Sequence, residues 1–497
     1  MDRKNRFSIL LRQLMSVAEL KNYMLAKDLQ YDVSYISKWV SGQMLPAEKA
    51  KVNVLREISR CVVASVDSEK RNVLLNEYQV DNAQELECAI YDHLDAEYNY
   101  VRGLQKQTGA SISPKTVFYP EATLPEYIAK MTHPVLRRVK SLDIMAAMDL
   151  LSIEHEYRLQ IVDIRDANPS ENHYYPDVHF SMLINLDVDK LDCVYDTVFL
   201  INMLSKNTKL DFQLYGSRSA CGRVIFAVAH EFAISGMLAG PNRCLSVVTS
   251  EEQKTSDVYY DYVKNLCGRE SLLFRRTSIY NMLRGHEYVR SLLSPHLRWV
   301  MGHMTEHFLP DDLFDEIVDR LAAQGKENDI TREEIYDLHR LTHNLLEESD
   351  IQIVIYESAF ADLNATGELD FFNYKVCLTP EQRRRYLEYL FTLCRDKKNL
   401  EVKLVYGELV TDFQYIANQC VFLSDMLSYL RLDNSRRTNN NLVIINRRDV
   451  QALFDSFYEH IWTECEEIVI SDRAAISNYI RHTIQGSHLI SQTGRDA

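Results

Sequence analysis

The chain lacks any run of about 20 uninterrupted apolar residues, the length that a membrane-spanning helix needs, so no membrane association is predicted. Its ten cysteines stand singly, without a C-x-x-C pair, which excludes zinc knuckles and thioredoxin-like redox pairs. The basic and apolar first residues resemble a signal peptide, but charges at Arg12, Glu19 and Lys21 interrupt them. We therefore expect a cytoplasmic protein in a reducing compartment.

Motifs that carry common catalytic chemistry are also missing. The sequence has no G-x-x-x-x-G-K-[ST] phosphate-binding loop and no G-x-S-x-G nucleophile elbow. His230 and Glu231 are not followed by the second histidine of a zinc-protease motif. We predict no catalytic residues and no cofactor.

Two histidine pairs have a spacing that would place both rings on one face of a helix, where they could hold a metal. We interpret them as partly exposed helix residues and predict no metal site. The pairs, each with the carboxylate that could join it, are His303 and His307 with Asp311, and His339 and His343 with Glu347.

Charge is distributed unevenly. Residues 1–60 contain eleven Lys and Arg against six Asp and Glu, a net charge of +5. Since the whole chain carries −15, the remaining 437 residues carry −20. A polyanion would be attracted by the first segment and repelled by the rest. If the partner is a nucleic acid, the amino-terminal segment must bind it.

This segment contains the signals of three consecutive helices. Apolar residues repeat with helical spacing from Phe7 to Met15 and again from about Glu19 to Leu29. Asp32 is a suitable N-cap for a third helix, which Gly42 can end in a left-handed conformation. Pro46 is then expected to open a fourth helix.

The run LAKDLQYDVSYISKWVSGQMLP, residues 25–46, resembles the Cro/phage-repressor-type (XRE-like) helix-turn-helix, whose pattern is L-A-x-x-L-G-V-S-x-S-x-I-S-x-W-x-x-G-x-x-x-P. Ile36 and Trp39 occupy the inward positions of the recognition helix, and Gly42 and Pro46 complete the match. Gln30 departs from the pattern by replacing the turn glycine, which would strain the turn if its φ is positive. The resemblance covers residues 7–62 and implies a transcription regulator.

In this family the amino-terminal end of the recognition helix enters the major groove of double-stranded DNA. The resemblance therefore assigns DNA contacts to the outer face of the third helix, and a phosphate contact to the first turn of the second helix. The predicted DNA-binding residues are Asn22, Val33, Ser34, Tyr35, Ser37 and Lys38. Members of the family generally bind as homodimers, which we also expect here.

Beyond residue 65, residues 66–115 are acidic and have a helical pattern, and we expect a connector or dimerisation element that ends near the SISP stretch at 111–114. The rest contains an internal repeat with a spacing near 190 residues, in which apolar runs alternate with helices as in α/β units. The matched pairs are 159–163 with 351–355, 209–216 with 399–407, 244–250 with 441–447, and the helices 257–267 with 452–462. Two such units would leave a cleft between them, a common place for a ligand.

The duplicated arrangement resembles the phospholipase-D-like fold, whose enzymes carry H-x-K-x-x-x-x-D in each half. No H-x-K occurs in this chain. AVAHEFAISG at 227–236 is at most a degenerate remnant, and the matching YIANQCVFLS at 415–424 has no histidine. If the resemblance holds, the catalytic residues are missing.

We therefore predict a multidomain protein: an all-α helix-turn-helix head, a helical connector and two pseudo-repeated α/β units. Its expected function is DNA-binding transcription regulation, with a body that senses a small-molecule or protein effector or assembles the dimer. The alternatives are a DNA-targeted phosphodiesterase-like enzyme and a protein-interaction scaffold. The expected boundaries are 1–65 for the head, 66–115 for the connector, 116–285 and 286–484 for the repeats, and 485–497 for a flexible tail.

Overall fold

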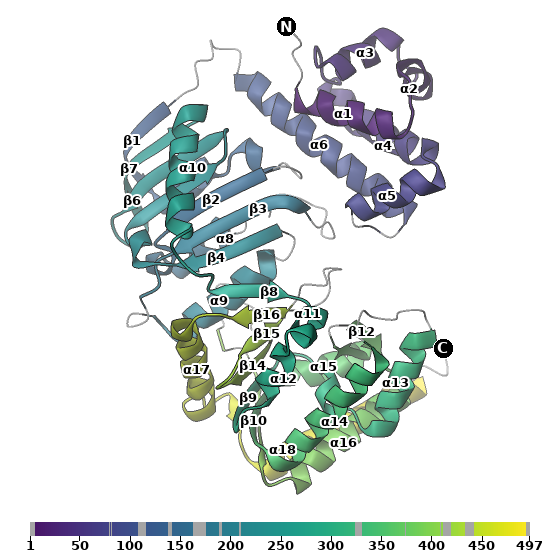
Figure 1. Cartoon of the computed structure of the whole chain (residues 1–497), viewed down its shortest axis with the longest axis vertical. Coiled ribbons are helices and arrows are strands. Elements are labelled where there is room, and N and C mark those ends of the chain that lie inside the picture. Colours follow the sequence, from purple (N-terminus) through teal and green to yellow (C-terminus); the bar gives the residue numbers. More distant parts are fainter. Residues whose placement is uncertain are drawn as a thin grey trace. The chain divides into compact units, whose positions relative to one another are not determined.

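The computed structural model shows a mixed α/β protein with three β-sheets (Figure 1). It divides into two compact units, the first formed by 1–185, 207–213 and 217–270, and the second by 186–206, 214–216 and 271–497. None of the helices in the described part of the chain combines the length and apolar character needed to cross a bilayer. The structure describes residues 5–78, 80, 82–107, 116–137, 142–162, 175–187, 191–207, 210–323, 331–372, 374–407, 409–410, 419–432 and 442–493.

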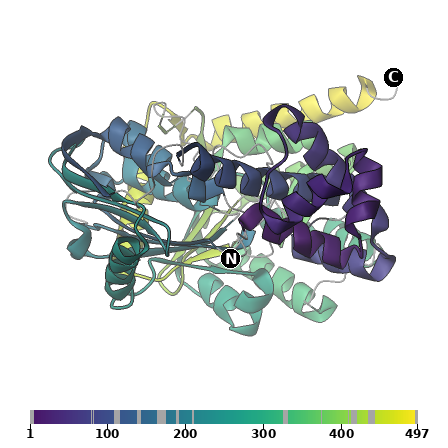
Figure 2. The same ribbon diagram turned by 90° about the horizontal axis from the view of Figure 1, so that it is seen from above.

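The first unit begins with a helical bundle, which we call the head and which is coloured purple to blue in Figures 1 and 2. Its core is formed by the apolar faces of α1, α3 and α4, with Phe7, Leu11, Ile36 and Leu55 fully buried. The helices are α1 (Arg6–Val17), α2 (Asn22–Leu29), α3 (Val33–Ser41), α4 (Lys51–Ser65), α5 (Ser68–Tyr78) and α6 (Ala83–Gln107).

The long helix α6 belongs to the core of the head, because it packs against α1 and α4. The Tyr98 ring meets that of Phe7 edge-on with centroids 6.0 Å apart, and its hydroxyl donates to the Pro46 carbonyl oxygen at 2.8 Å. The segment expected as a separate connector is therefore helical but completes the head. The SISP stretch lies outside the described residues.

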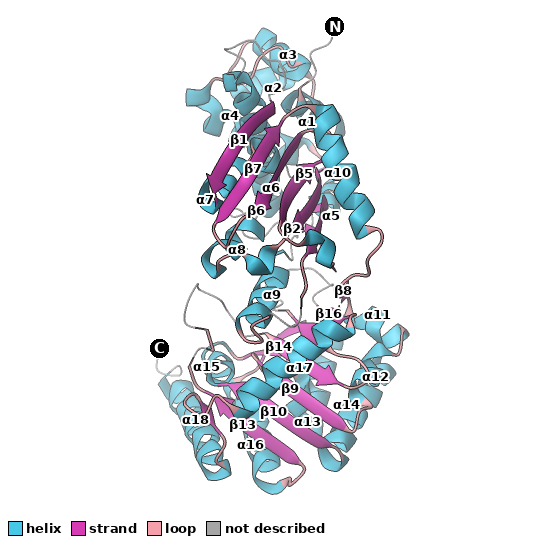
Figure 3. Cartoon of the chain, turned by 90° about the vertical axis from the view of Figure 1, so that its left-hand side faces the viewer, coloured by secondary structure: helices cyan, strands magenta, loops and turns pink. Residues whose placement is uncertain are grey.

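The α/β part of the first unit is a seven-stranded sheet in the order β1-β7-β6-β5-β2-β3-β4, with β3 and β4 labelled in Figure 1 and β5 in Figure 3. Strands β2 and β3 are parallel, whereas β5, β6, β7 and β1 continue the sheet in antiparallel fashion. Helix α10 packs across β2, β3, β5 and β6. The elements are β1 (Thr116–Thr123), α7 (Leu124–Met131), β2 (Leu142–Met148), α8 (His155–Val162), β3 (Tyr175–Ile184), β4 (Leu210–Gly216), β5 (Arg223–Val228), β6 (Phe232–Leu238), β7 (Arg243–Ser250) and α10 (Gln253–Cys267).

The second unit contains an eight-stranded sheet in the order β17-β13-β10-β9-β14-β15-β16-β8 and a small hairpin, β11–β12. Alternate residues of β10, Ile351, Ile353 and Ile355, point into one core with α13, α14, α16 and α18, whereas α17 packs outside that core (Figure 3). The strands are β8 (Phe274–Thr277), β9 (His296–Met301), β10 (Asp350–Tyr356), β11 (Glu368–Phe371), β12 (Tyr374–Cys377), β13 (Leu400–Val405), β14 (Cys420–Ser424), β15 (Tyr429–Arg431), β16 (Leu442–Ile445) and β17 (Val469–Ile470). The helices are α9 (Tyr195–Lys206), α11 (Ile279–Arg284), α12 (Glu287–Leu292), α13 (Asp311–Ala323), α14 (Arg332–Glu348), α15 (Glu357–Thr366), α16 (Pro380–Asp396), α17 (Arg448–Thr463) and α18 (Arg473–Thr493).

The two large sheets have the same connection order. Replacing β1 to β7 of the first sheet by β8, β9, β10, β13, β14, β15 and β16 gives the order of the second, with β17 added at its edge. The predicted matches of β4 with β13, β7 with β16 and α10 with α17 fall at equivalent places in the two orders. The match of 159–163 with β10 is wrong, because Leu159, Ile161 and Val162 lie in helix α8 and the strand equivalent to β10 is β3.

Two boundaries also differ from expectation. The second sheet begins with β8 at Phe274, whereas the second repeat was expected from residue 286. The tail expected to be flexible from residue 485 continues as helix α18 to Thr493.

Candidate functional site

The first candidate site is the pair of short helices α2 and α3, which are joined by three residues. Helix α3 begins at Asp32, whose Oδ1 accepts a hydrogen bond from the Ser34 backbone N–H at 2.8 Å. The hydrogen bonds from Ser34 lower the pKa of Asp32. The helix ends at Gly42, which adopts the left-handed conformation at φ 79°. Both predicted helix ends are therefore confirmed.

The connecting turn takes a conformation that favours glycine. Gln30 has φ 56° and ψ 38°, the left-handed region, which costs a non-glycine residue about 1 kcal/mol. The turn is nevertheless anchored, since the Tyr31 ring packs against Trp39 with centroids 5.2 Å apart. The expected strain at Gln30 is thus present, and aromatic packing holds the turn in place.

Helix α3 has one buried face and one exposed face. Ile36 and Trp39 are 0% and 1% exposed, whereas Val33 and Tyr35 are 43% and 46% exposed. Asn22 on α2 is half-buried, and its Nδ2 donates to the Ser37 Oγ at 3.2 Å. The predicted contact residues therefore lie on two helices. Asn22 stands in the first turn of α2, and five residues are exposed on α3: Val33, Ser34, Tyr35, Ser37 and Lys38. Their role in DNA binding stays a prediction.

The prediction for Pro46 is wrong. This residue is buried and precedes a 3-10 turn at Glu48–Ala50, and helix α4 starts only at Lys51. Its carbonyl oxygen accepts the Tyr98 hydroxyl, so Pro46 anchors the chain to α6 instead of opening a helix.

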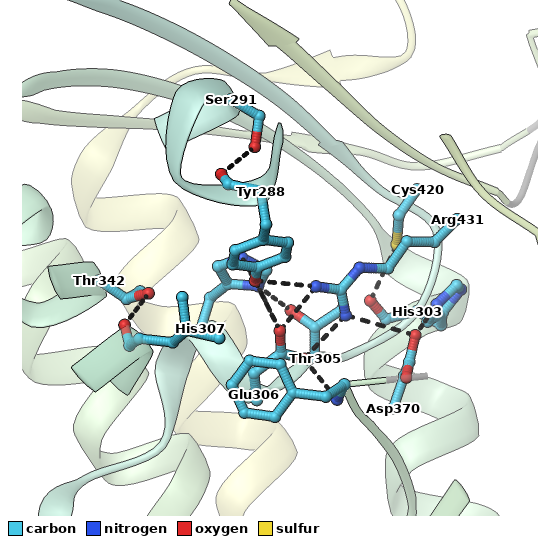
Figure 4. Close-up of polar contacts among 12 residues, drawn as sticks. Tyr288, Ser291, His303, Thr305, Glu306, His307, Thr342, Asp370, Cys420 and Arg431 are labelled. Carbon is cyan, nitrogen blue, oxygen red and sulfur yellow. Dashed lines mark hydrogen bonds and ion pairs between the residues drawn. The ribbon is translucent and has the colours of Figure 1, made fainter. Parts of the chain in front are cut away.

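A second group of polar side chains lies buried in the second unit (Figure 4). Arg431 on β15 is fully buried and donates two hydrogen bonds to Glu306, from Nη1 to Oε2 at 2.8 Å and from Nη2 to Oε1 at 2.6 Å. The Tyr288 hydroxyl donates to Glu306 Oε1 at 3.0 Å, and Asp370 Oδ2 lies 3.5 Å from Arg431 Nη1. Burial disfavours ionisation of Glu306, but the Arg431 guanidinium outweighs it and lowers the pKa of Glu306 to about 2.

This buried network is closed to a substrate. Glu306 and Asp370 are 4% and 8% exposed, and both carboxylate oxygens of Glu306 accept hydrogen bonds from within the network. A buried pair with this geometry fixes the positions of its elements, because removing one partner leaves an uncompensated charge. We assign it a structural role, joining β15 to the segment after β9.

The histidines of the first predicted pair belong to this network and not to a helix. His303 lies in the turn after β9, with Nε2 3.2 Å from Asp370 Oδ2. His307 lies in a 3-10 turn at Glu306–Phe308, and its Nδ1 is 2.8 Å from the Thr305 Oγ1. Burial lowers the pKa of His307 to about 4, so this ring is neutral near pH 7.

The second pair, His339 and His343, does lie on one face of helix α14. Its carboxylate neighbour is Asp311, the first residue of α13, and not the predicted Glu347, which pairs with Lys397 at 2.9 Å. Burial, followed by the proximity of His343, lowers the pKa of His339 to about 4. The sequence analysis singled out Asp311 and the pair His339 and His343 separately, but it could not show the packing of α13 on α14 that brings them together.

The second unit also has a cleft of about 520 Å³. It lies where the parallel strands β9, β10 and β13 begin, and its lining includes His296, Asp350, Lys398, Glu401 and Asp425. Ligands of open α/β sheets bind beyond the carboxyl ends of parallel strands, the opposite edge, so we assign no ligand to this cleft.

The segment considered a degenerate catalytic remnant is a surface turn. His230 lies between β5 and β6 with φ 66°, and its ring Nδ1 is 2.9 Å from Asp257 Oδ1. Its side chain is 69% exposed. Residues 415–418 of the matching segment lie outside the described residues.

Comparison with known proteins identifies no family. No protein-family model matches the chain, and no curated protein does. Among solved structures, the chain is similar to the phosphatidylserine synthase of Haemophilus influenzae Rd KW20, with 12% sequence identity and a TM-score of 0.24. The similarity covers 79% of this chain and 97% of that chain. At this TM-score it establishes neither a shared fold nor a shared activity.

Proposed function

We propose that the protein is a DNA-binding transcription regulator that contacts double-stranded DNA through helix α3. The observation that carries this proposal is the division of α3 into two faces. The buried side chains of Ile36 and Trp39 hold the helix on the head. The other face of the helix carries five exposed side chains, those of Val33, Ser34, Tyr35, Ser37 and Lys38. A helix of this kind fits the major groove of B-form DNA.

The chemistry of the exposed face suits base edges and phosphates. Ser34 and Ser37 carry hydroxyls that can donate or accept hydrogen bonds, and Val33 offers an apolar contact for a thymine methyl group. Lys38 lies over the Tyr35 ring at 5.9 Å and extends from the exposed face as a cation. Lys21, the N-cap residue of α2, and Lys27 on α2 add positive charge nearby.

The body would serve this function as an effector sensor or a dimerisation element. Regulators of this architecture read two half-sites about one helical turn apart, so a homodimer is part of the proposal.

The test measures binding of labelled duplexes, selected from random sequence, to the full-length protein by fluorescence anisotropy at several salt concentrations. Lys38→Ala should weaken binding, and if Lys38 contacts only phosphate the salt slope should fall by about one. Lys254→Ala, which removes an exposed lysine from α10, is the matched control and should leave binding unchanged. Equal effects of the two substitutions, or no binding at low salt, would refute the proposal.

A second candidate function is a phosphodiesterase-like activity of the body. The observation that favours it is the shared connection order of the two sheets, since phospholipase-D-like enzymes are also built from two α/β halves. The absence of H-x-K counts against it. Hydrolysis of bis(p-nitrophenyl) phosphate by the full-length protein would support this candidate, and no turnover above buffer would eliminate it.

A further inference from the structure

Three potential metal ligands from two helices converge in the second unit. They are one carboxylate oxygen of Asp311 and one imidazole nitrogen each of His339 and His343, all within 4.8 Å of one another. Asp311 Oδ1 is 2.9 Å from His339 Nε2 and 3.6 Å from His343 Nδ1. A tetrahedral zinc ion with bonds of about 2.0 Å holds its ligand atoms about 3.3 Å apart. These two separations lie on either side of that value.

A hydrogen bond fixes which nitrogen of His343 can bind a cation. Its Nε2 lies 2.9 Å from the backbone carbonyl oxygen of Leu309. Because a carbonyl only accepts, Nε2 must carry the proton, and Nδ1 therefore has a lone pair on the side of Asp311. Metal-binding histidines are commonly oriented by such a bond from the other ring nitrogen. The weak contact of Nδ1 with the Tyr389 hydroxyl, at 3.4 Å, would give way to the metal.

The two imidazoles are held by packing, whereas the carboxylate can adjust. His339 stacks on Phe314 with ring centroids 3.8 Å apart, and His343 stacks on Tyr389 at 5.6 Å. The Asp311 side chain is 82% exposed, so it can rotate to complete the coordination. The cluster is thus rigid on the protein side and open on the solvent side, where an ion can enter and water can complete its coordination.

We propose that Asp311, His339 and His343 form a binding site for a divalent transition metal, with Zn²⁺ as the best fit. Two nitrogens and one oxygen are a ligand set that zinc accepts, whereas Mg²⁺ and Ca²⁺ favour oxygen ligands. Since the ligands come from α13 and α14, the ion ties the two helices together. The fourth position belongs to water.

The experiment titrates Zn²⁺ into the full-length, chelator-treated protein by calorimetry and uses Co²⁺ absorption to report the ligands. We expect one site per chain, with the absorption of tetrahedral Co²⁺ and no thiolate charge-transfer band. Asp311→Asn and His343→Ala should each weaken binding by at least the ~10-fold that loss of an outer-shell partner costs. Asp311 is exposed, so its substitution should leave folding intact; circular dichroism checks this.

His179→Ala is the matched control, because His179 pairs with Asp211 at 2.7 Å outside the cluster. It should bind Zn²⁺ as tightly as the unmodified protein. The proposal is overturned by the absence of stoichiometric binding, by binding that survives both cluster substitutions, or by a thiolate spectrum that assigns the ion to the cysteines.

Discussion

A buried carboxyl group in the head makes a quantitative prediction about pH. Glu97 on α6 is 5% exposed, and no described residue forms a hydrogen bond with its Oε2. Burial raises the pKa of Glu97 to about 7 from its ordinary value of 4.5; Arg6 opposes the rise and Glu231 adds to it. One pKa unit corresponds to about 1.4 kcal/mol, so ionising this group in the folded head costs about 3 kcal/mol.

The sign of the effect follows from proton binding. Between pH 4.5 and about 7 the folded head keeps the Glu97 proton while the unfolded chain loses it, so stability falls as the pH rises. Glu97→Gln stays neutral in both states and removes this dependence. The variant should therefore gain about 3 kcal/mol of stability relative to the unmodified protein between pH 4.5 and pH 8.

The assay is urea unfolding at pH 5 and pH 8 with 5-fluorotryptophan and ¹⁹F NMR. The chain has three tryptophans, at 39, 299 and 462, and Trp39 lies in the head, so its resonance reports the head alone. Glu87→Gln, on the same helix but only half-buried, is the control and should not reproduce the pH-dependent gain. A difference between Glu97→Gln and the unmodified protein that is the same at both pH values would refute the reasoning.

Three further predictions test the network and the α2–α3 pair. Glu306→Gln should destabilise the second unit by about 3–5 kcal/mol, because Arg431 loses its buried counter-charge, and the Trp299 resonance in the same unfolding assay measures this loss. Replacing both Glu306 and Arg431 with Leu and Met should reduce the stability less than Glu306→Gln does. A double variant that loses as much stability or more would contradict this explanation. Gln30→Gly should stabilise the head by up to ~1 kcal/mol and Gln30→Val should destabilise it, since φ is positive there; equal unfolding midpoints at Trp39 would show that the turn is unstrained. Asp32→Ala should lower the Trp39 unfolding midpoint at pH 7 while Asp32→Asn largely preserves it, because either Asp or Asn can accept the Ser34 N–H; a similar loss in both variants would assign the effect to charge instead.

Local signals in the sequence were sufficient to predict helix α3 of the head. The cap at Asp32, the left-handed end at Gly42 and the inward positions of Ile36 and Trp39 are all properties of a few neighbouring residues. The wrong prediction of a strand at Leu159 also came from a local pattern. The run at Leu159 is short and apolar, a pattern that fits a buried strand and a buried helix equally well, and tertiary packing selected the helix.

The candidate sites of the second unit depend on contacts that a sequence does not display. Arg431 and Glu306 are 125 residues apart, and only the placement of β15 beside the segment after β9 joins them. The helical spacing of His339 and His343 was readable, but their partner Asp311 was assigned to the other histidine pair because it lies closer along the chain. The spacing of His339 and His343 identified one face of α14, but the packing of α13 against α14 determines that Asp311 is the third member of the proposed site.

The ion pairs of the head determine where its positive charge is available to a partner. Lys51 on α4 lies 2.6 Å from Asp95 of α6, and Arg6 on α1 pairs with Glu231 in the β5–β6 turn, so these cations are compensated. Exposed charges are screened over about 10 Å at 0.1 M salt, so the cations that matter to a polyanion are those next to it. Three exposed lysines of α2, its N-cap and α3 form no ion pair with any described residue: Lys21, Lys27 and Lys38. The acidic partners thus neutralise Arg6 and Lys51, whereas Lys21, Lys27 and Lys38 have no ion pair among the described residues and lie on or beside α3, the helix proposed to contact DNA.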